Sequence, residues 1–220
     1  MRWWSWLLGG SAGKNVPQSE QIWMTGRVRD EQVVARLKGA APEARVILVV
    51  HFREDFDSLQ DRLGRDRVDL EEIEPRSPDH FEDLVRSPGR YLVYSDALKP
   101  QGVASTRPVA NAPLELLMVS RPMRHAVDEQ ILAFARELAS PVHLQVFSSL
   151  DDLLVRAFSG DRVLELLKTL GMAEEEAIES AMVTRQIRKA QKAFEKECSV
   201  PADVRSLRDW IDRNDRLRPS

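Results

Sequence analysis

A glycine-rich run near the start of the chain contains the residue types of a phosphate-binding loop. Residues 9–15 read Gly-Gly-Ser-Ala-Gly-Lys-Asn. Such a loop needs a glycine six residues before its lysine and a serine or threonine directly after it, to meet magnesium. Leu8 and Asn15 occupy these two positions, and no strand pattern precedes the run. We therefore expect no nucleotide site here, and residues 9–19, which include Pro17, fit a flexible linker.

Two pairs of adjacent acids could take part in acid–base catalysis. They are Glu54-Asp55 and Asp151-Asp152. Carboxylates at a helix start meet unpaired backbone N–H groups and the positive end of the helix dipole. Helix capping is therefore the interpretation that we favour for both pairs.

The histidines and the single cysteine offer little further chemistry. No two histidines stand at the spacing of metal ligands on a helix, and none has a cysteine nearby. The histidines are His51, His80, His125 and His143. Cys198 is the only cysteine, which excludes an internal disulfide and a multi-cysteine metal site and fits a reducing compartment. We expect Cys198 to be a free thiol, and we expect no catalytic residue, no metal and no cofactor.

Length and charge limit the classes of protein that the chain can represent. A chain of 220 residues can bury the core of one ordinary domain plus an appendage. The formal net charge is −3, and acidic and basic residues are mixed along the chain, so no basic field favours a nucleic acid. We expect a cytoplasmic protein with no nucleic-acid partner.

The N-terminus concentrates tryptophan in a short segment. Trp3, Trp4 and Trp6 are three of the five tryptophans of the chain. The apolar run around them is too short to cross a bilayer or to form a cleaved signal peptide. Because tryptophan favours the headgroup level of a membrane, these side chains could form a peripheral membrane contact at the inner membrane face. The alternative is that the segment folds back onto the protein or frays.

Apolar patterns that alternate between strand and helix periods predict an α/β domain. Arg45–Phe52 is an almost continuous apolar run, typical of a strand that is covered on both sides. Further strands are expected at residues 22–24, 68–73, 90–94, 114–120 and 142–147, and helices at residues 30–38, 55–63, 80–85 and 127–138. This order predicts a doubly wound, mainly parallel sheet. We expect three parts: an N-terminal segment and linker at 1–19, the α/β domain at 20–150, and a C-terminal helical extension at 151–220.

The helical extension contains an amphipathic helix with a basic face. Ile187, Ala190, Phe194 and Cys198 recur at steps of three and four residues and predict a packed face. The remaining faces carry Arg185, Arg188, Lys189, Lys192 and Lys196. This basic face is either simply solvated or a contact for an acidic partner or an anionic lipid. A final helix is expected after Pro201, with Trp210 on its apolar stripe.

The passage from Phe147 onward carries a resemblance to a known family. Residues 147–158 read FSSLDDLLVRAF, and Asp161-Arg162-Val163, Leu170-Gly171-Met172, Glu176–Glu179 and Val183–Lys192 follow. In order and spacing, these pieces resemble the SecA preprotein translocase motor. In that family, the stretch leaves the second RecA-like motor domain and enters a long helical scaffold. The resemblance implies a RecA-like fold for the α/β part of this chain.

Followed backward, the resemblance breaks at the residues that contact nucleotide in the family. Asp128–Ile131 resembles the Asp-Asn-Gln-Leu that opens the arginine-finger motif, and Arg124-His125 resembles the Arg-His upstream of it. The two finger arginines are replaced by Phe134 and Glu137. A finger acts by bringing positive charge to the phosphoryl group, which neither residue can do.

A second nucleotide-contacting loop also departs from the family. Ser95–Pro100 stands where the family has Gly-Arg-Gly-Thr-Asp, and it lacks those glycines and that arginine. The former finger segment instead predicts an amphipathic helix that packs on the sheet through Val127, Ile131, Phe134, Ala135 and Leu138.

We therefore expect a non-catalytic SecA-like protein that acts as an accessory or regulator of preprotein translocation. Its partner would be a protein, either the translocation machinery or its substrate. Two alternatives stay open: a membrane-associated interaction module unrelated to secretion, and half of a motor that a partner ATPase subunit completes.

Overall fold

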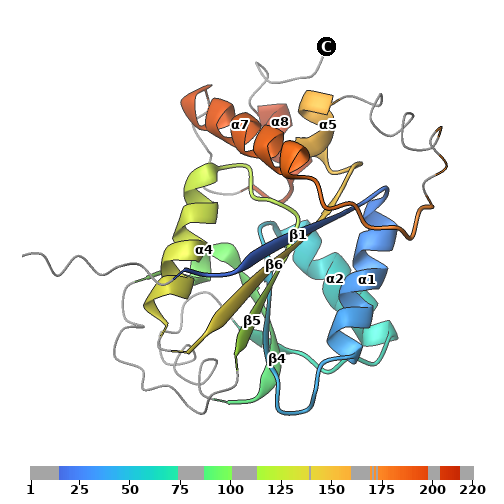
Figure 1. The fold of residues 1–220 in the computed structure, drawn as a ribbon, viewed down its shortest axis with the longest axis vertical. Coiled ribbons are helices and arrows are strands. Elements are labelled where there is room, and N and C mark those ends of the chain that lie inside the picture. The colour runs from blue at the N-terminus through green and yellow to red at the C-terminus, as the bar shows by residue number, and fades with distance from the viewer. Residues whose placement is uncertain are drawn as a thin grey trace, which may run out of the picture.

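The chain folds into a six-stranded parallel sheet with helices on both faces (Figure 1). The computed structural model describes residues 15–73, 87–100, 113–138, 140–159, 173–197 and 204–213, together with residues 169 and 171. The strand order is β1-β6-β5-β2-β4-β3, and every neighbouring pair is parallel. The strands are β1 (Gln18–Trp23), β2 (Arg45–Val50), β3 (Glu71–Ile73), β4 (Gly89–Tyr94), β5 (Leu114–Val119) and β6 (Val142–Ser149). This topology confirms the doubly wound α/β fold.

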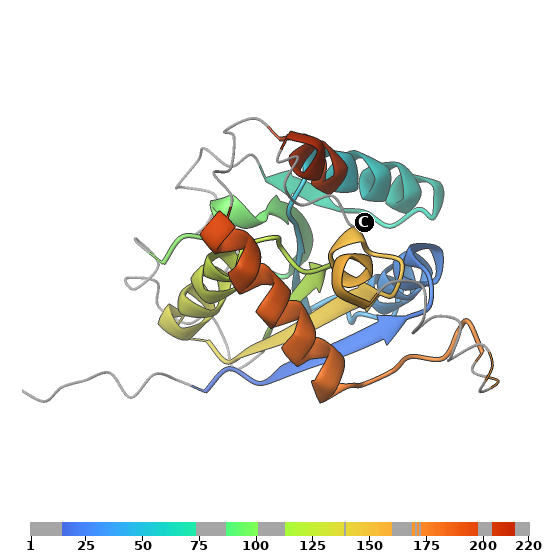
Figure 2. The ribbon, with the colours of Figure 1, turned by 90° about the horizontal axis from the view of Figure 1, so that it is seen from above.

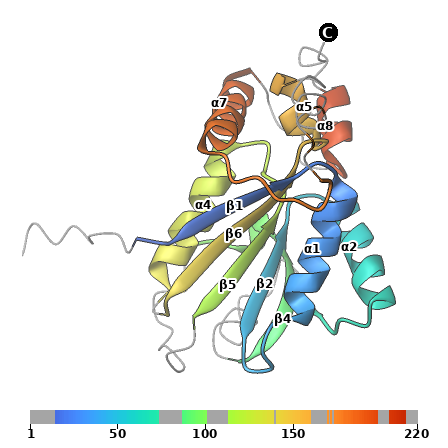
Figure 3. The same ribbon diagram turned by 45° about the vertical axis from the view of Figure 1, so that its right-hand side comes forward.

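Two helical layers explain why the central strands are apolar on both sides. All six residues of β2 are buried. The helix α4 (His125–Glu137) covers one face of the sheet, and α1 (Gly26–Lys38) and α2 (Arg53–Arg65) cover the other (Figure 3). Alternate residues of β2 therefore enter different cores: Ile47 packs with the α4 layer and Leu48 with the α1 and α2 layer.

The C-terminal helices form a third layer over the carboxyl ends of the strands (Figure 2). They are α5 (Leu153–Ser159), α7 (Ala181–Glu197) and α8 (Leu207–Arg213). Their shared core includes Leu154, Ile187 and Trp210. The Trp210 ring meets the Phe194 ring edge to face, with 6.0 Å between ring centroids. Just before α8, the carbonyl of Arg205 accepts a hydrogen bond of 3.0 Å from the Glu54 N–H in α2.

Most expected elements are found, with shifted ends. β1 begins at Gln18, four residues before the expected start, and Val16 is buried, so the end of the expected linker is part of the fold. The final helix begins at Leu207. The expected helix at residues 80–85 lies outside the described residues, as do residues 160–168 of the expected helical extension. Within the described ranges, no helix has the length and apolar character needed to cross a membrane.

Candidate functional site at the carboxyl edge of the sheet

A cavity of about 250 Å³ lies where strands β2, β5 and β6 end. Ligands of open α/β sheets bind at this edge, beyond the carboxyl ends of the strands. The floor of the cavity includes His51 after β2, Ser120 after β5 and Ser148 near the end of β6. Its covering side includes Leu154 of α5, Ile187 of α7 and Leu207 of α8. The chain's own C-terminal layer therefore covers the edge at which a ligand would be expected.

Arg29 of α1 is the central cation of this cavity. Its Nη1 donates to Asp152 Oδ1 at 2.7 Å and to the Ser120 hydroxyl, and its Nε donates to Asp30 Oδ1 at 2.8 Å. Burial alone would lower the pKa of Arg29, but the neighbouring carboxylates, Asp152 foremost, raise the pKa above its ordinary value. The guanidinium is therefore fully engaged by protein groups.

Asp55 is the carboxylate of the cavity whose protonation is most perturbed. It lies in the first turn of α2, which has no side-chain hydrogen bond at its N-cap, and the described residues supply no hydrogen-bond donor to it. Burial raises the pKa of Asp55 to about 6, and the nearby Asp152 and Asp30 also raise it, against the opposing effect of Arg29. Asp55 is thus not the simple helix cap that we expected.

The second acid pair does cap a helix, but a distant one. Asp151 Oδ1 accepts a hydrogen bond of 2.8 Å from the Gly26 N–H, at the start of α1. Asp152 accepts from the Ser149 N–H at 2.9 Å and pairs with Arg29. The pair was expected to cap the helix that it precedes; the structure instead places Asp151 at the start of α1, 125 residues earlier in the chain.

Ser120 and His51 form a strained corner of the cavity. Ser120 has φ 64°, in the left-handed region that non-glycine residues seldom adopt. Its carbonyl oxygen lies 3.3 Å from His51 Nε2. A carbonyl can only accept, so Nε2 carries the proton in this contact. Burial lowers the pKa of His51 to about 4, so the ring is neutral at pH 7.

A buried polar network beside the cavity ties α7 to the sheet. Arg121 pairs with Glu20 of β1 at 3.0 Å and with Asp128 of α4 at 3.2 Å. From α7, Gln191 Nε2 donates to Asp128 at 3.0 Å and the Thr184 hydroxyl donates to Glu20 at 2.6 Å. Burial would raise the pKa of Glu20, but Arg121, together with the hydrogen bonds from Thr184 and Ser148, lowers it below its ordinary value, whereas burial raises the pKa of Asp128.

The charges that line the cavity are of both signs. Three arginines line it, and so do four carboxylates. They are Arg29, Arg121, Arg208, Glu54, Asp55, Asp151 and Asp152. Arg29 and Arg121 are already paired with acids. Within the described ranges, no three His, Cys, Asp or Glu side chains are grouped to hold a metal ion that could offset the excess acid.

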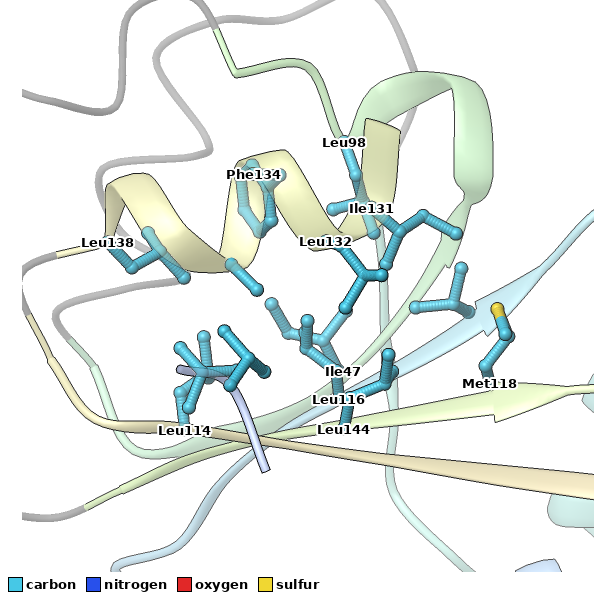
Figure 4. Packing of buried hydrophobic residues seen from close by; sticks show 14 of the residues in the cluster. Ile47, Leu98, Leu114, Leu116, Met118, Ile131, Leu132, Phe134, Leu138 and Leu144 are labelled. Carbon is cyan, nitrogen blue, oxygen red and sulfur yellow. The ribbon is translucent and has the colours of Figure 1, made fainter. Parts of the chain in front are cut away.

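Phe134 and Glu137, which stand where the resemblance would place arginine fingers, have different surroundings in the structure. Phe134 is fully buried, and Figure 4 shows it with Ile131 and Leu138 on the side of α4 that faces the strand residues Ile47 and Leu116. The expected apolar face of this helix is confirmed. Glu137 and its neighbour Arg136 are exposed at the end of the helix.

The loop after β4 is also part of the packing. Ser95–Ala97 forms a short 3-10 helix, η1, and Leu98 is fully buried. Gln130 of α4 donates to the carbonyls of Ser95 at 3.2 Å and of Leu98 at 3.0 Å. These two hydrogen bonds pair the Gln130 amide with the carbonyls of the loop and hold the loop against α4.

Among the remaining sequence candidates, Ile187 lines the cavity and the five cations of α7 do not. Ile187 and Phe194 pack inward on α7, as expected. The five cations of the basic face, Arg185, Arg188, Lys189, Lys192 and Lys196, are all exposed. Trp3, Trp4, Trp6 and Cys198 lie outside the described residues.

Comparison with curated proteins gives a consistent set of relatives. The protein translocase subunit SecA of Nitratiruptor sp. is 28% identical over 180 residues, which are 79% of this chain and 21% of that protein. The SecA of Psychrobacter cryohalolentis is 30% identical over 126 residues, 57% of this chain and 12% of that protein. This chain is related to SecA. It spans about a fifth of the SecA of Nitratiruptor sp., and no protein-family model matches it.

The relationship to SecA agrees with the RecA-like architecture expected from residues 147–192. Among solved structures, the Escherichia coli DEAD-box protein SrmB, bound to the regulator RraA, is 17% identical, with a TM-score of 0.42 over 68% of this chain and 86% of that one. The C-terminal domain of S. cerevisiae Dbp5 also reaches 0.42, at 10% identity over 81% of this SecA-related chain and 99% of that domain. At scores below 0.5, these likenesses add nothing on function.

The groups that dominate the cavity of this SecA relative were not singled out from the sequence. Arg29, Ser120 and Arg121 stand at the end of a strand or the start of a helix, and ligand-binding residues of α/β folds are found at such junctions. Their location at these junctions was the sequence signal that could have identified them as site residues. Which junctions become neighbours depends on strand order, which local patterns do not contain.

Proposed function

We propose that this SecA-related chain is a non-catalytic accessory protein or regulator of preprotein translocation. The observation that carries the proposal is the burial of Phe134 in the core. By the resemblance, this position holds an arginine finger in the SecA motor. An apolar ring beneath a sheet cannot bring charge to a phosphoryl group. Arg136 is adjacent to Glu137, but one step along a helix turns a side chain by about 100°. Arg136 therefore does not point where an arginine at position 137 would point.

The carboxyl edge of the sheet supports the same proposal. A triphosphate there would meet Glu54, Asp55 and Asp151, while Arg29 and Arg121 are held by protein carboxylates. The α5, α7 and α8 layer also covers this edge. A motor needs the edge open to nucleotide, whereas an accessory protein can use it to hold its helices in place.

A non-catalytic protein acts through its contacts, and two surfaces are available. We expect the exposed cations of α7 to meet a protein surface of opposite charge. We expect Trp3, Trp4 and Trp6 to give a transient contact with the inner face of the membrane from the cytoplasmic side. Substituting the three tryptophans with serine should abolish co-sedimentation with anionic vesicles; unchanged co-sedimentation would exclude this contact.

Nucleotide binding is the direct test of the non-catalytic role. We would titrate the purified chain with ATP and with ADP, each with magnesium, in a calorimeter. The expected result is no binding heat. A dissociation constant below about 100 μM, roughly −5.5 kcal/mol, would contradict the proposal and favour half of a motor that awaits a partner subunit.

The link to translocation needs its own experiment. We would measure SecA-driven transport of a purified preprotein into inverted membrane vesicles, with and without an excess of this chain. A changed initial rate, together with capture of the chain by SecA, its channel or the preprotein, is expected. An unchanged rate without capture would sink the translocation role and favour an interaction module that is unrelated to secretion.

A further inference from the structure

The two mostly buried arginines of the cavity are already paired with carboxylates of the protein. Arg29 pairs with Asp152 at 2.7 Å, and Arg121 pairs with Glu20 at 3.0 Å and with Asp128 at 3.2 Å. An anion that entered the cavity would have to compete with these carboxylates for the guanidinium groups. The paired arginines therefore hold the fold together and are poor anchors for an anionic ligand.

Asp55 is different, because its carboxylate is half-buried and has no partner. Asp151 accepts a hydrogen bond from the Gly26 N–H at 2.8 Å, and Asp152 is paired with Arg29. Among the described residues, none donates a hydrogen bond to Asp55 or forms an ion pair with it. A charged carboxylate in a partly buried place is stabilised by a cation that donates hydrogen bonds to it. Asp55 can therefore accept such a group from outside the chain.

His51 contributes a second acceptor to the cavity. Its Nε2 carries the proton that the Ser120 carbonyl accepts at 3.3 Å, so Nδ1 of the neutral ring has only a lone pair. Nδ1 is buried and has no hydrogen-bond partner in the described part of the chain. A buried acceptor without a donor costs free energy. Asp55 and His51 are thus both complementary to an N–H donor.

The exposed charges that line the cavity leave an excess of acid. Glu54 and Arg208 are both exposed, have opposite signs and offset one another. Asp151 is also exposed, and its printed hydrogen bonds come from neutral donors. In the part of the chain that the structure describes, no three His, Cys, Asp or Glu side chains are grouped to hold a metal ion. The charges therefore favour an organic cation.

The covering side of the cavity is apolar. Leu154 and Val155 of α5, Ile187 of α7 and Leu207 of α8 line it there. The volume of about 250 Å³ is slightly below the range of roughly 300–1,000 Å³ that is usual for pockets of drug-sized ligands. A small molecule with a charged head and a short apolar chain matches both sides of this space.

We propose that the cavity binds a primary ammonium group on a short alkyl chain. The ammonium would lie against Asp55, with His51 as a second acceptor, and the alkyl chain would lie against the apolar side chains of α5, α7 and α8. Such a group can come from two sources, a free alkylamine or the lysine side chain of a peptide. In either case, binding would join the edge of the sheet to the C-terminal layer.

Titration of the full chain with n-butylammonium chloride tests the proposal. At about pH 8, Asp55 is ionised, because its pKa is about 6, and the ammonium is charged. At constant ionic strength, the NMR signals of the Asp55, Ser120 and Leu207 amides should shift and saturate, with a dissociation constant on the order of 1 mM. n-Butanol lacks the charge and tetramethylammonium lacks N–H donors, so each should bind at least about tenfold more weakly.

Two further comparisons separate the charged head from the alkyl chain. From methylammonium to n-butylammonium, the affinity should rise about fourfold per methylene, because each methylene buries more apolar surface. Asp55→Asn keeps the size of the side chain and removes its charge, and it should weaken n-butylammonium binding about tenfold or more. Asp57→Asn changes an exposed acid of the same helix and should bind like the wild type.

Nα-acetyl-lysine N-methylamide distinguishes the two sources. If it binds as tightly as n-butylammonium, the cavity accepts the lysine side chain of a peptide; if only n-butylammonium binds, the cavity accepts a free alkylamine. The absence of saturable shifts with both probes would overturn the proposal. Equal affinities of the wild type and Asp55→Asn, or of n-butylammonium and n-butanol, would overturn it too. These titrations read neither nucleotide binding nor transport, so their failure leaves the proposed function untouched.

Discussion

Gln191 of α7 donates a hydrogen bond of 3.0 Å to the buried carboxylate of Asp128 in α4. The same Nε2 donates to the carbonyl of Pro122 at 2.6 Å. Asp128 also pairs with Arg121, which pairs with Glu20. One buried amide therefore joins the C-terminal layer to the α/β domain through a network that includes three ionisable side chains.

Gln191→Ala should destabilise the protein by about 1–3 kcal/mol, because it leaves buried acceptors without their donor. Gln186→Ala, at an exposed position of the same helix, is the control and should change the free energy of unfolding by less than about 0.5 kcal/mol. Urea unfolding followed by circular dichroism measures both. Equal midpoints for the two variants would show that the Gln191 contact contributes nothing.

Asp55 should make stability fall as pH rises. The folded-state pKa of Asp55 is raised to about 6 from 3.8, so the folded protein binds the proton more tightly than the unfolded chain. The associated stability is present below about pH 4 and is lost as pH rises through about 6.

The substitution Asp55→Asn removes this titration and should increase stability above pH 7 by about 1–3 kcal/mol, with no increase at pH 4. Asp57→Asn, at an exposed position of the same helix, is the matched control. Unfolding free energies at pH 4, 6 and 8 provide the comparison. If the difference in unfolding free energy between Asp55→Asn and the wild type does not vary with pH, the pKa of Asp55 is not raised in the folded protein.

The Arg29–Asp152 pair should show strong coupling. The two side chains are mostly buried, with exposed fractions of 12% and 15%, and lie 2.7 Å apart. Removing Arg29 leaves Asp152 without its counter-charge, which typically costs about 3–5 kcal/mol for a buried pair, whereas removing Asp152 leaves Arg29 paired with Asp30. The double variant should therefore cost less than the sum of Arg29→Ala and Asp152→Ala, by about 0.5–3 kcal/mol. Additive losses in a double-mutant cycle would show that the pair is not coupled.

Trp210→Ala should release α8 while the sheet stays folded. Trp210 is 2% exposed and packs on Phe194, so its loss removes the main anchor of a seven-residue helix. Hydrogen exchange would report this at the Glu54 N–H, which donates to the Arg205 carbonyl and should become less protected. The amides of β2 should stay protected, and Arg213→Ala, at an exposed position of α8, should change neither. Loss of protection in β2 would show instead that α8 and the sheet unfold together.

Local sequence patterns determined much of the fold. The apolar run at residues 45–52 predicted β2, and helical spacing predicted that Phe134 and Ile131 would face the sheet. Helical spacing likewise predicted the exposed basic face of α7. These predictions hold because strand and helix periods assign each side chain to a face, and the apolar face becomes the buried one.

Only the tertiary structure decided which of these elements meet. Asp151 caps α1, Asp152 pairs with Arg29, and the edge strand β1 lies beside β6, although these partners are more than 100 residues apart. The tertiary structure also placed the C-terminal helices over the carboxyl edge of the sheet. This covering forms the cavity, in which burial raises the pKa of Asp55. Such contacts depend on strand order and on the burial that neighbouring elements impose, and a residue's own local pattern contains neither.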